Sequence, residues 1–150
     1  MLKENDAAPE FELPNQDGET IRLTDLKGKK VILYFYPKDD TPGCTAQACD
    51  IRDHYAEFKK RGALIFGVSP DSVRSHKKFE EKYGLPFPLL ADEGHAVADK
   101  YGVWGEKSMY GKKYFGVDRT TFVIDEQGRI AKIFPKVKPS EHVDQVLAVL

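Results

Sequence analysis

An uninterrupted apolar run, Val31–Tyr36, is the feature that most constrains the fold of this chain. β-Branched and aromatic residues without alternating polar positions are typical of a strand that is covered on both faces. A second run of this kind, Ala63–Ser69, follows after a helical pattern at about residues 43–61. These three segments predict a βαβ unit with a right-handed crossover. The chain is therefore expected to be an α/β protein in which helices enclose a sheet.

The helical pattern of this unit has one apolar stripe. Ala48, Ile51, Tyr55 and Phe58 recur at spacings of three and four residues, which is typical of a helix face that packs on a core. Three consecutive cations followed by Gly62 predict the end of the helix, because cations are favoured at the negative end of the helix dipole.

The remaining apolar patterns are shorter and are separated by turn residues. Segment 103–117, with three glycines, predicts an ordered loop or an irregular hairpin. We find no repeat or linker, so the 150 residues predict a single domain over 1–150. The other predicted elements are an N-terminal β-hairpin from Phe11–Leu13 and Ile21–Leu23, a helix capped by Asp71 or Ser72 and ended by Gly84, a strand near Leu90, a helix over Ala96–Tyr101, a hairpin from Thr120–Asp125 and Arg129–Phe134, and a last helix with Val143, Val146, Leu147 and Leu150.

Charge and hydropathy exclude several classes of function. The formal net charge is -1, which gives no electrostatic reason to expect binding to nucleic acid or to an anionic membrane. No apolar run approaches the roughly 18 residues that span a bilayer. Residues 1–6 are charged rather than apolar, so we expect no secretory signal and a reducing, cytoplasmic location.

The only two cysteines, Cys44 and Cys49, lie where the first strand passes into the helix. A thiol in the first turn of a helix lies near unpaired N–H groups and the positive end of the dipole, and both favour the thiolate. Pro37 and Pro42 stiffen the preceding loop, and Thr41 places a hydroxyl three residues before Cys44. Cys44 is therefore a candidate nucleophile.

Ideal helix geometry separates the two cysteines. Cys44 lies on the apolar stripe and should face the sheet, whereas Cys49 lies about 160° around the axis from Ile51 and should face outward. Residues five apart in a helix have Cα atoms roughly 8.7 Å apart, and a disulfide needs at most about 7 Å. The two thiols can therefore bond only if the first turns of the helix unwind.

Other interpretations of these residues need weighing. The spacing disfavours a static disulfide, and two thiols on opposite sides of a helix with no Cys/His quartet disfavour zinc. Two inert thiols are the default for arbitrary positions, but Gln47 lies one turn after Cys44 and could orient a partner, and Arg119 is a candidate guanidinium for the thiolate. Asp39 and Asp40 are expected to cap the loop. The histidines at positions 76, 95 and 142 are expected to be solvated.

Four blocks of the sequence resemble one family. The pattern Pro37-x-x-x-Thr41-x-x-Cys44 is similar to the peroxidatic motif of peroxiredoxins. Gly43-Cys44-Thr45-x-x-x-Cys49 resembles the bacterioferritin comigratory protein (peroxiredoxin Q) branch, as do Tyr101–Lys107 and Arg119–Asp125. The resemblance covers nearly the whole chain. It implies a thioredoxin-like sandwich with a central mixed β-sheet flanked by helices.

The resemblance also implies a function. The chain would reduce hydrogen peroxide and organic hydroperoxides without a metal or organic cofactor, with Cys44 as the peroxidatic cysteine and Thr41, Pro37 and Arg119 around it. Cys49 would be the resolving cysteine, thioredoxin the reductant, and the protein a monomer. A protein thiol–disulfide oxidoreductase and a non-enzymatic redox sensor or holdase are the alternatives that the residues leave open.

Overall fold

A mixed sheet of five strands, in the order β5-β4-β3-β8-β9, forms the centre of the computed structural model, which describes residues 1–150. Strands β3 and β4 are parallel, as are β4 and β5, whereas β8 is antiparallel to both β3 and β9. The parallel pair confirms the predicted βαβ unit. The strands are β3 (Lys30–Phe35), β4 (Ala63–Ser69), β5 (Leu89–Ala91), β8 (Thr120–Ile124) and β9 (Ile130–Phe134).

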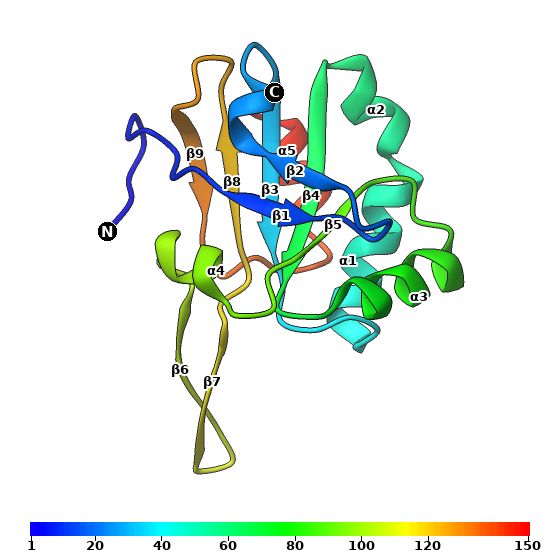
Figure 1. Cartoon of the computed structure of the whole chain (residues 1–150), viewed down its shortest axis with the longest axis vertical. Coiled ribbons are helices and arrows are strands. Elements are labelled where there is room, and N and C mark those ends of the chain that lie inside the picture. Colours follow the sequence, from blue (N-terminus) through cyan, green and yellow to red (C-terminus); the bar gives the residue numbers. More distant parts are fainter.

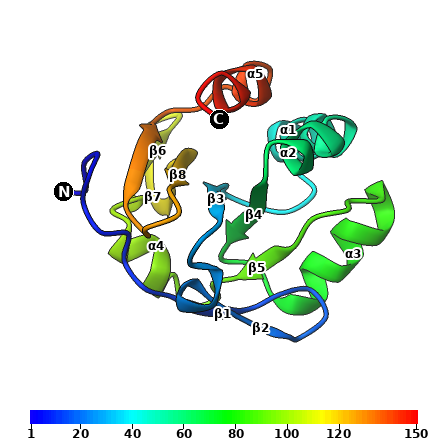
Figure 2. The same ribbon diagram turned by 90° about the horizontal axis from the view of Figure 1, so that it is seen from above.

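Helices cover both faces of this sheet. Helices α1, α2 and α5 lie on one face, whereas α4 and a hairpin of β1 and β2 lie on the other (Figures 1 and 2). No helix in the structure combines the length and the apolar character that crossing a lipid bilayer requires. The helices are α1 (Pro42–Asp53), α2 (Tyr55–Lys60), α3 (Val73–Tyr83), α4 (Ala96–Lys100) and α5 (His142–Leu147), with a single 3₁₀ turn at Leu23–Leu26.

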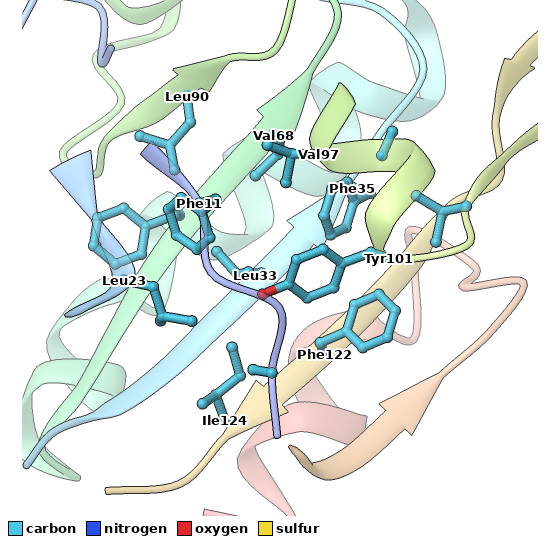
Figure 3. Close-up of a cluster of buried hydrophobic side chains, with 14 of the residues drawn as sticks. Phe11, Leu23, Leu33, Phe35, Val68, Leu90, Val97, Tyr101, Phe122 and Ile124 are labelled. Atoms are coloured by element: carbon cyan, nitrogen blue, oxygen red, sulfur yellow. The ribbon is translucent and has the colours of Figure 1, made fainter. Parts of the chain in front are cut away.

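The strands separate two apolar cores, because successive side chains of a strand point to opposite faces. On strand β3, Leu33 and Phe35 enter one core, and Ile32 and Tyr34 enter the other. We call the first the hairpin-side core; Figure 3 labels Phe11, Leu23, Leu33, Phe35, Val68, Leu90, Val97, Tyr101, Phe122 and Ile124 in it. We call the second the cysteine-side core; it contains Ile32, Tyr34, Tyr36, Cys44, Ala48, Ile51, Phe58, Ile65, Phe79, Val123, Val143 and Val146.

The N-terminal hairpin follows the sequence pattern, whereas the glycine-rich segment is more regular than the predicted loop or irregular hairpin. Strand β1 (Glu12–Pro14) pairs with β2 (Thr20–Arg22) and sets Leu13 opposite Ile21, which confirms the predicted N-terminal hairpin. The glycine-rich segment forms a regular two-stranded ladder, β6 (Trp104–Met109) with β7 (Lys112–Val117). This second hairpin projects from the body of the molecule (Figure 1). Tyr110 at its tip is fully exposed and has a φ of 52°.

The single helix predicted over 43–61 is wrong in one respect. It is divided into α1 and α2 at His54, where φ is −113° and ψ is 12°. The His54 N–H approaches the carbonyls of both Asp50 and Ile51, and the ring Nδ1 lies 2.9 Å from the Asp50 oxygen. These contacts tighten the last turn of α1 and end it. The apolar stripe survives the break, since Ile51 and Phe58 are both buried.

Candidate active site

The loop that leaves β3 delivers Cys44 to the first turn of α1. Thr41 is the extended residue before the helix, and Pro42 is the first residue of the helix. Proline lacks an N–H, which costs nothing at this position because the first N–H groups of a helix have no partner within it. The Cys44 side chain enters the cysteine-side core and is 1% exposed. The sulfur therefore lies at the positive end of α1 and out of bulk water, as the sequence predicts.

A guanidinium lies beside this sulfur. Arg119 Nη2 is 3.3 Å from Cys44 Sγ, and Nη1 donates to Gln47 Oε1 at 2.6 Å. Gln47 is completely buried one turn after Cys44, so its amide fixes the guanidinium in the plane that reaches the sulfur. A cation at this distance stabilises a thiolate and never loses its own charge. The structure thus places Arg119 next to Gln47 and Cys44, which precede it in the sequence by 72 and 75 residues.

Gly43 is a residue of this site that the sequence reasoning missed. A Cβ atom at this position would lie 3.2 Å from Arg119 Nη2 and 3.7 Å from Pro139. The absence of a side chain therefore leaves room for the guanidinium next to the sulfur. The only signal in the sequence was the glycine directly before the cysteine in the family motif.

Thr41 and Pro37 complete the loop around the sulfur. The Thr41 hydroxyl donates to the carbonyl of Lys38 at 2.9 Å, so in this arrangement its oxygen can only accept a further hydrogen bond. The Thr41 carbonyl accepts from the N–H of Thr45 at 2.8 Å and begins the helical ladder. Pro37 is half-buried at the start of this loop. The hydroxyl oxygen is thus suited to accept from a hydroperoxide O–H.

Cys49 lies on the other side of the same helix. It is partly exposed whereas Cys44 is buried, and both are free thiols within the continuous helix α1. This arrangement confirms the orientations predicted from helix periodicity. Residues with this spacing have Cα atoms roughly 8.7 Å apart, so the folded helix keeps the thiols beyond the reach of a disulfide.

The expectation that His142 is solvated is wrong. It is completely buried on α5, and its Nε2 lies 2.8 Å from the Thr121 hydroxyl. Burial, and to a smaller extent the charge of Arg119, lowers the pKa of His142 to about 4. The ring is therefore neutral near pH 7 and places no second positive charge next to the arginine.

His76 is also buried, contrary to expectation, and its Nδ1 lies 2.7 Å from the carboxylate of Asp39. Asp39 therefore does more than cap its own loop. The third histidine, His95, is partly exposed and stacks on Trp104 with ring centroids 3.9 Å apart.

A cavity of about 430 Å³ lies away from this chemistry. Tyr101, Val103 and Phe122 line it, and these residues belong to the hairpin-side core. The sheet therefore separates this cavity from Cys44, and we assign it no part in the reaction.

Comparisons with known proteins agree with the geometry. Residues 5–133 match the AhpC/TSA family. The chain is 54% identical to a putative peroxiredoxin bcp of Coxiella burnetii over 143 residues, which cover 95% of each chain. It is 51% identical to peroxiredoxin Bcp of Bacillus subtilis, covering 95% of this chain and 91% of that relative.

Solved structures give the same result. Peroxiredoxin Q of Xanthomonas campestris matches with a TM-score of 0.87 and 42% identity, over 92% of this chain and 88% of that one. The bacterioferritin comigratory protein of the same organism matches with a TM-score of 0.88 and 40% identity, over 95% and 96%. PrxQ of Xylella fastidiosa matches with a TM-score of 0.93 and 32% identity, over 99% and 94%. The chain therefore belongs to the AhpC/TSA family and is a peroxiredoxin of the Bcp branch, a thiol-dependent peroxidase.

Proposed function

We propose that Cys44 is the peroxidatic cysteine of an enzyme that reduces hydrogen peroxide and organic hydroperoxides. The observation that carries the proposal is the distance of 3.3 Å between Arg119 Nη2 and Cys44 Sγ, with Nη1 held by Gln47. An oriented cation beside a buried thiol at a helix start favours the reactive thiolate. The similar bacterioferritin comigratory protein of Xanthomonas campestris is described by its alkyl peroxide reduction activity, which supports organic hydroperoxides as substrates.

In the first step the Cys44 thiolate attacks one peroxide oxygen and the O–O bond breaks. Cys44 becomes a sulfenic acid, and the other oxygen leaves as water or an alcohol after taking up a proton. Arg119 and the N–H groups at the start of α1 stabilise the charge that develops on the departing oxygen. Thr41 accepts a hydrogen bond from the hydroperoxide and orients it, while Pro37 helps to exclude water.

In the second step the thiol of Cys49 displaces the sulfenic oxygen of Cys44 as water and forms a disulfide. Because the folded helix holds the two Cα atoms beyond bonding distance, the first turns of α1 must unwind before this step. An external dithiol then reduces the disulfide. We assign this role to thioredoxin acting on a monomer in a reducing compartment such as the cytoplasm, where a two-thiol cycle can be renewed.

Peroxide-dependent NADPH oxidation, coupled through thioredoxin and its reductase, tests this cycle. We expect the native chain to turn over and Cys44→Ser to show no consumption of peroxide above background. Cys49→Ser should form one sulfenic acid per chain, detectable by a dimedone-type probe, and then stop. Turnover by Cys44→Ser would exclude Cys44 as the nucleophile, and normal cycling by Cys49→Ser would exclude Cys49 as the resolving residue.

A further inference from the structure

The carboxylate of Asp39, in the loop before α1, is buried and lies within hydrogen-bond distance of three side chains. The Tyr36 hydroxyl donates to Oδ1 at 2.5 Å, the Ser75 hydroxyl donates to Oδ2 at 2.8 Å, and His76 Nδ1 lies 2.7 Å from Oδ2. The backbone N–H of Asp39 donates to the Asp71 carboxylate at 2.8 Å. The side chains of Asp39 and His76 are only 4% and 0% exposed. An acidic residue of the active-site loop is thus fixed inside the protein against α3.

The partners of His76 determine its protonation. Its Nε2 lies 2.9 Å from the carbonyl of Leu90, and a carbonyl can only accept, so Nε2 carries a proton. Its Nδ1 faces the Asp39 carboxylate, which also accepts. A neutral imidazole has a single N–H, so Nδ1 can donate to an ionised Asp39 only if the ring is doubly protonated and positively charged; with a neutral ring, Asp39 itself would have to carry the proton and donate to Nδ1.

The groups around this ring favour the charged pair. The titratable side chains that face it are Asp39 and Asp71, both acidic, and Tyr36. Burial, with the charges of Tyr34 and Asp39, raises the pKa of Tyr36 well above its ordinary value, so that it stays a donor to the carboxylate. A buried carboxylate is costly without a counter-charge, and His76 supplies that charge.

Helix α3 holds the chain on both sides of the cysteines. Before them, Asp40 accepts from Lys82 and from the Tyr83 hydroxyl, each at 2.7 Å. After them, Arg52 donates to the Tyr83 carbonyl at 2.7 Å. The contact of Asp40 with Lys82 is exposed, where solvent screens an ion pair. The contact of Asp39 with His76 is buried, so solvent screens it less than the contact of Asp40 with Lys82.

We propose that protonated His76 is a positioning residue of the peroxidase reaction. By holding Asp39 it fixes the loop that begins α1, sets Cys44 against Arg119, and confines unwinding to the segment from about residue 41 to 51. The functional part of this inference rests on the proposed role of Cys44, whereas the protonation and the hold on α1 do not.

The protonation is tested by NMR of the histidine ring nitrogens in the reduced protein. We expect both nitrogens of His76 to carry protons at pH 7. In Asp39→Asn the amide can donate to Nδ1, so one of these N–H signals should disappear. A single N–H in the native protein, or two in Asp39→Asn, would overturn the inference.

The hold on α1 is tested by two substitutions of His76, each of which keeps one of its two hydrogen bonds and removes the other. The amide nitrogen of Asn lies about where Nδ1 lies and can still donate to Asp39, whereas that of Gln lies about where Nε2 lies and reaches only the Leu90 carbonyl. A bond to a buried charged group changes an equilibrium by roughly tenfold or more. We therefore expect His76→Gln to speed amide exchange over residues 43–49 and to lower the rate constant for hydrogen peroxide by about that factor.

His76→Asn keeps a donor for Asp39 but not the charge, so in both measurements it should lose clearly less than His76→Gln. Lys82→Ala should stay within about twofold of the native protein, because it loses only exposed contacts on the same helix. Equal effects of His76→Asn and His76→Gln, or an effect of Lys82→Ala as large as that of His76→Gln, would contradict the inference. If no variant and not even the native chain consumes peroxide, the proposed function fails, and the amide exchange and ring signals still decide the inference.

Discussion

The two faces of the central sheet are built from the same strands but serve different ends. On the hairpin side, aromatic rings pack on one another (Figure 3). The ring centroid of Phe122 lies 5.7 Å from that of Phe35 and 5.0 Å from that of Tyr101, and both pairs are edge-on. On the cysteine side the core also contains Cys44, with Gln47, Thr121 and His142 buried near it. Both faces bury apolar side chains, and the cysteine side also holds polar groups around the thiol in a low-dielectric site.

The alternation of strand β8 connects the two faces. Phe122 and Ile124 enter the hairpin-side core, so Thr121, Val123 and, just before the strand, Arg119 belong to the opposite side. A shift of register by one residue would reverse every side chain. The burial of Phe122 on one face therefore helps to decide that Arg119 meets Cys44 on the other.

The largest effect should come from the hairpin side and should concern stability alone. We expect Phe122→Ala to lower the free energy of unfolding by about 3–5 kcal/mol, because it removes a fully packed ring. Urea denaturation measures this loss. The rate constant with hydrogen peroxide, per folded molecule, should stay within about twofold of that of the native protein. A tenfold fall would contradict the claim that the hairpin side affects stability alone.

On the cysteine side, removal of the guanidinium should affect the rate far more than the stability. We expect Arg119→Met to lower the second-order rate constant with peroxide by about 10²–10³, or about 3–4 kcal/mol of transition-state stabilisation. Arg119→Lys keeps the charge but cannot bond Gln47 and Cys44 at once. Its rate constant should therefore lie between those of the native protein and Arg119→Met. Stopped-flow fluorescence would measure both. An unchanged rate in Arg119→Met would remove the arginine from the mechanism.

The buried neutral His142 should make stability depend on pH. Its pKa is about 4 in the folded protein, compared with an ordinary value of 6.5 that applies in the unfolded chain. At pH values between these two, only the unfolded chain binds the proton. The free energy of unfolding should therefore fall by about 3 kcal/mol as pH falls from about 6.5 to 4, at about 1.4 kcal/mol per unit. Denaturation curves at several pH values should show a smaller fall in His142→Asn. Identical slopes in the two proteins would contradict the assignment.

The smallest effect should come from crowding the guanidinium. Gly43→Ala would place a Cβ atom 3.2 Å from Arg119 Nη2, which displaces that group by a few tenths of an ångström. We expect the peroxide rate constant to fall by less than about tenfold, since a full ångström costs about a hundredfold. Gly94→Ala is the matched control, because a Cβ there meets nothing within 4 Å. Equal rates for the two variants would show that Gly43 makes no room for the arginine.

The sequence predicted the elements and orientations that depend on local patterns, but it did not predict the buried polar contacts between distant residues. Strands β3 and β4 follow from uninterrupted apolar runs, and the inward Cys44 and outward Cys49 follow from helix periodicity, because these are local patterns. The buried histidines were missed because their partners are distant: Asp39 is 37 residues from His76, and Thr121 is 21 residues from His142. Charged neighbours in the sequence suggested a solvated surface at positions that tertiary pairing buries. Arg119 was one candidate guanidinium from the sequence, and only the family motif made it the expected partner of Cys44.

The central claim is that α1 is folded when Cys44 meets peroxide and unwound when Cys44 meets Cys49. Hydrogen–deuterium exchange of the reduced and the disulfide forms tests this claim most directly. We predict that amides of residues 44–49 are protected in the reduced form and exchange freely in the disulfide form, while β3 and β4 stay protected in both. Protection of residues 44–49 in a protein with an intact Cys44–Cys49 disulfide would contradict the account.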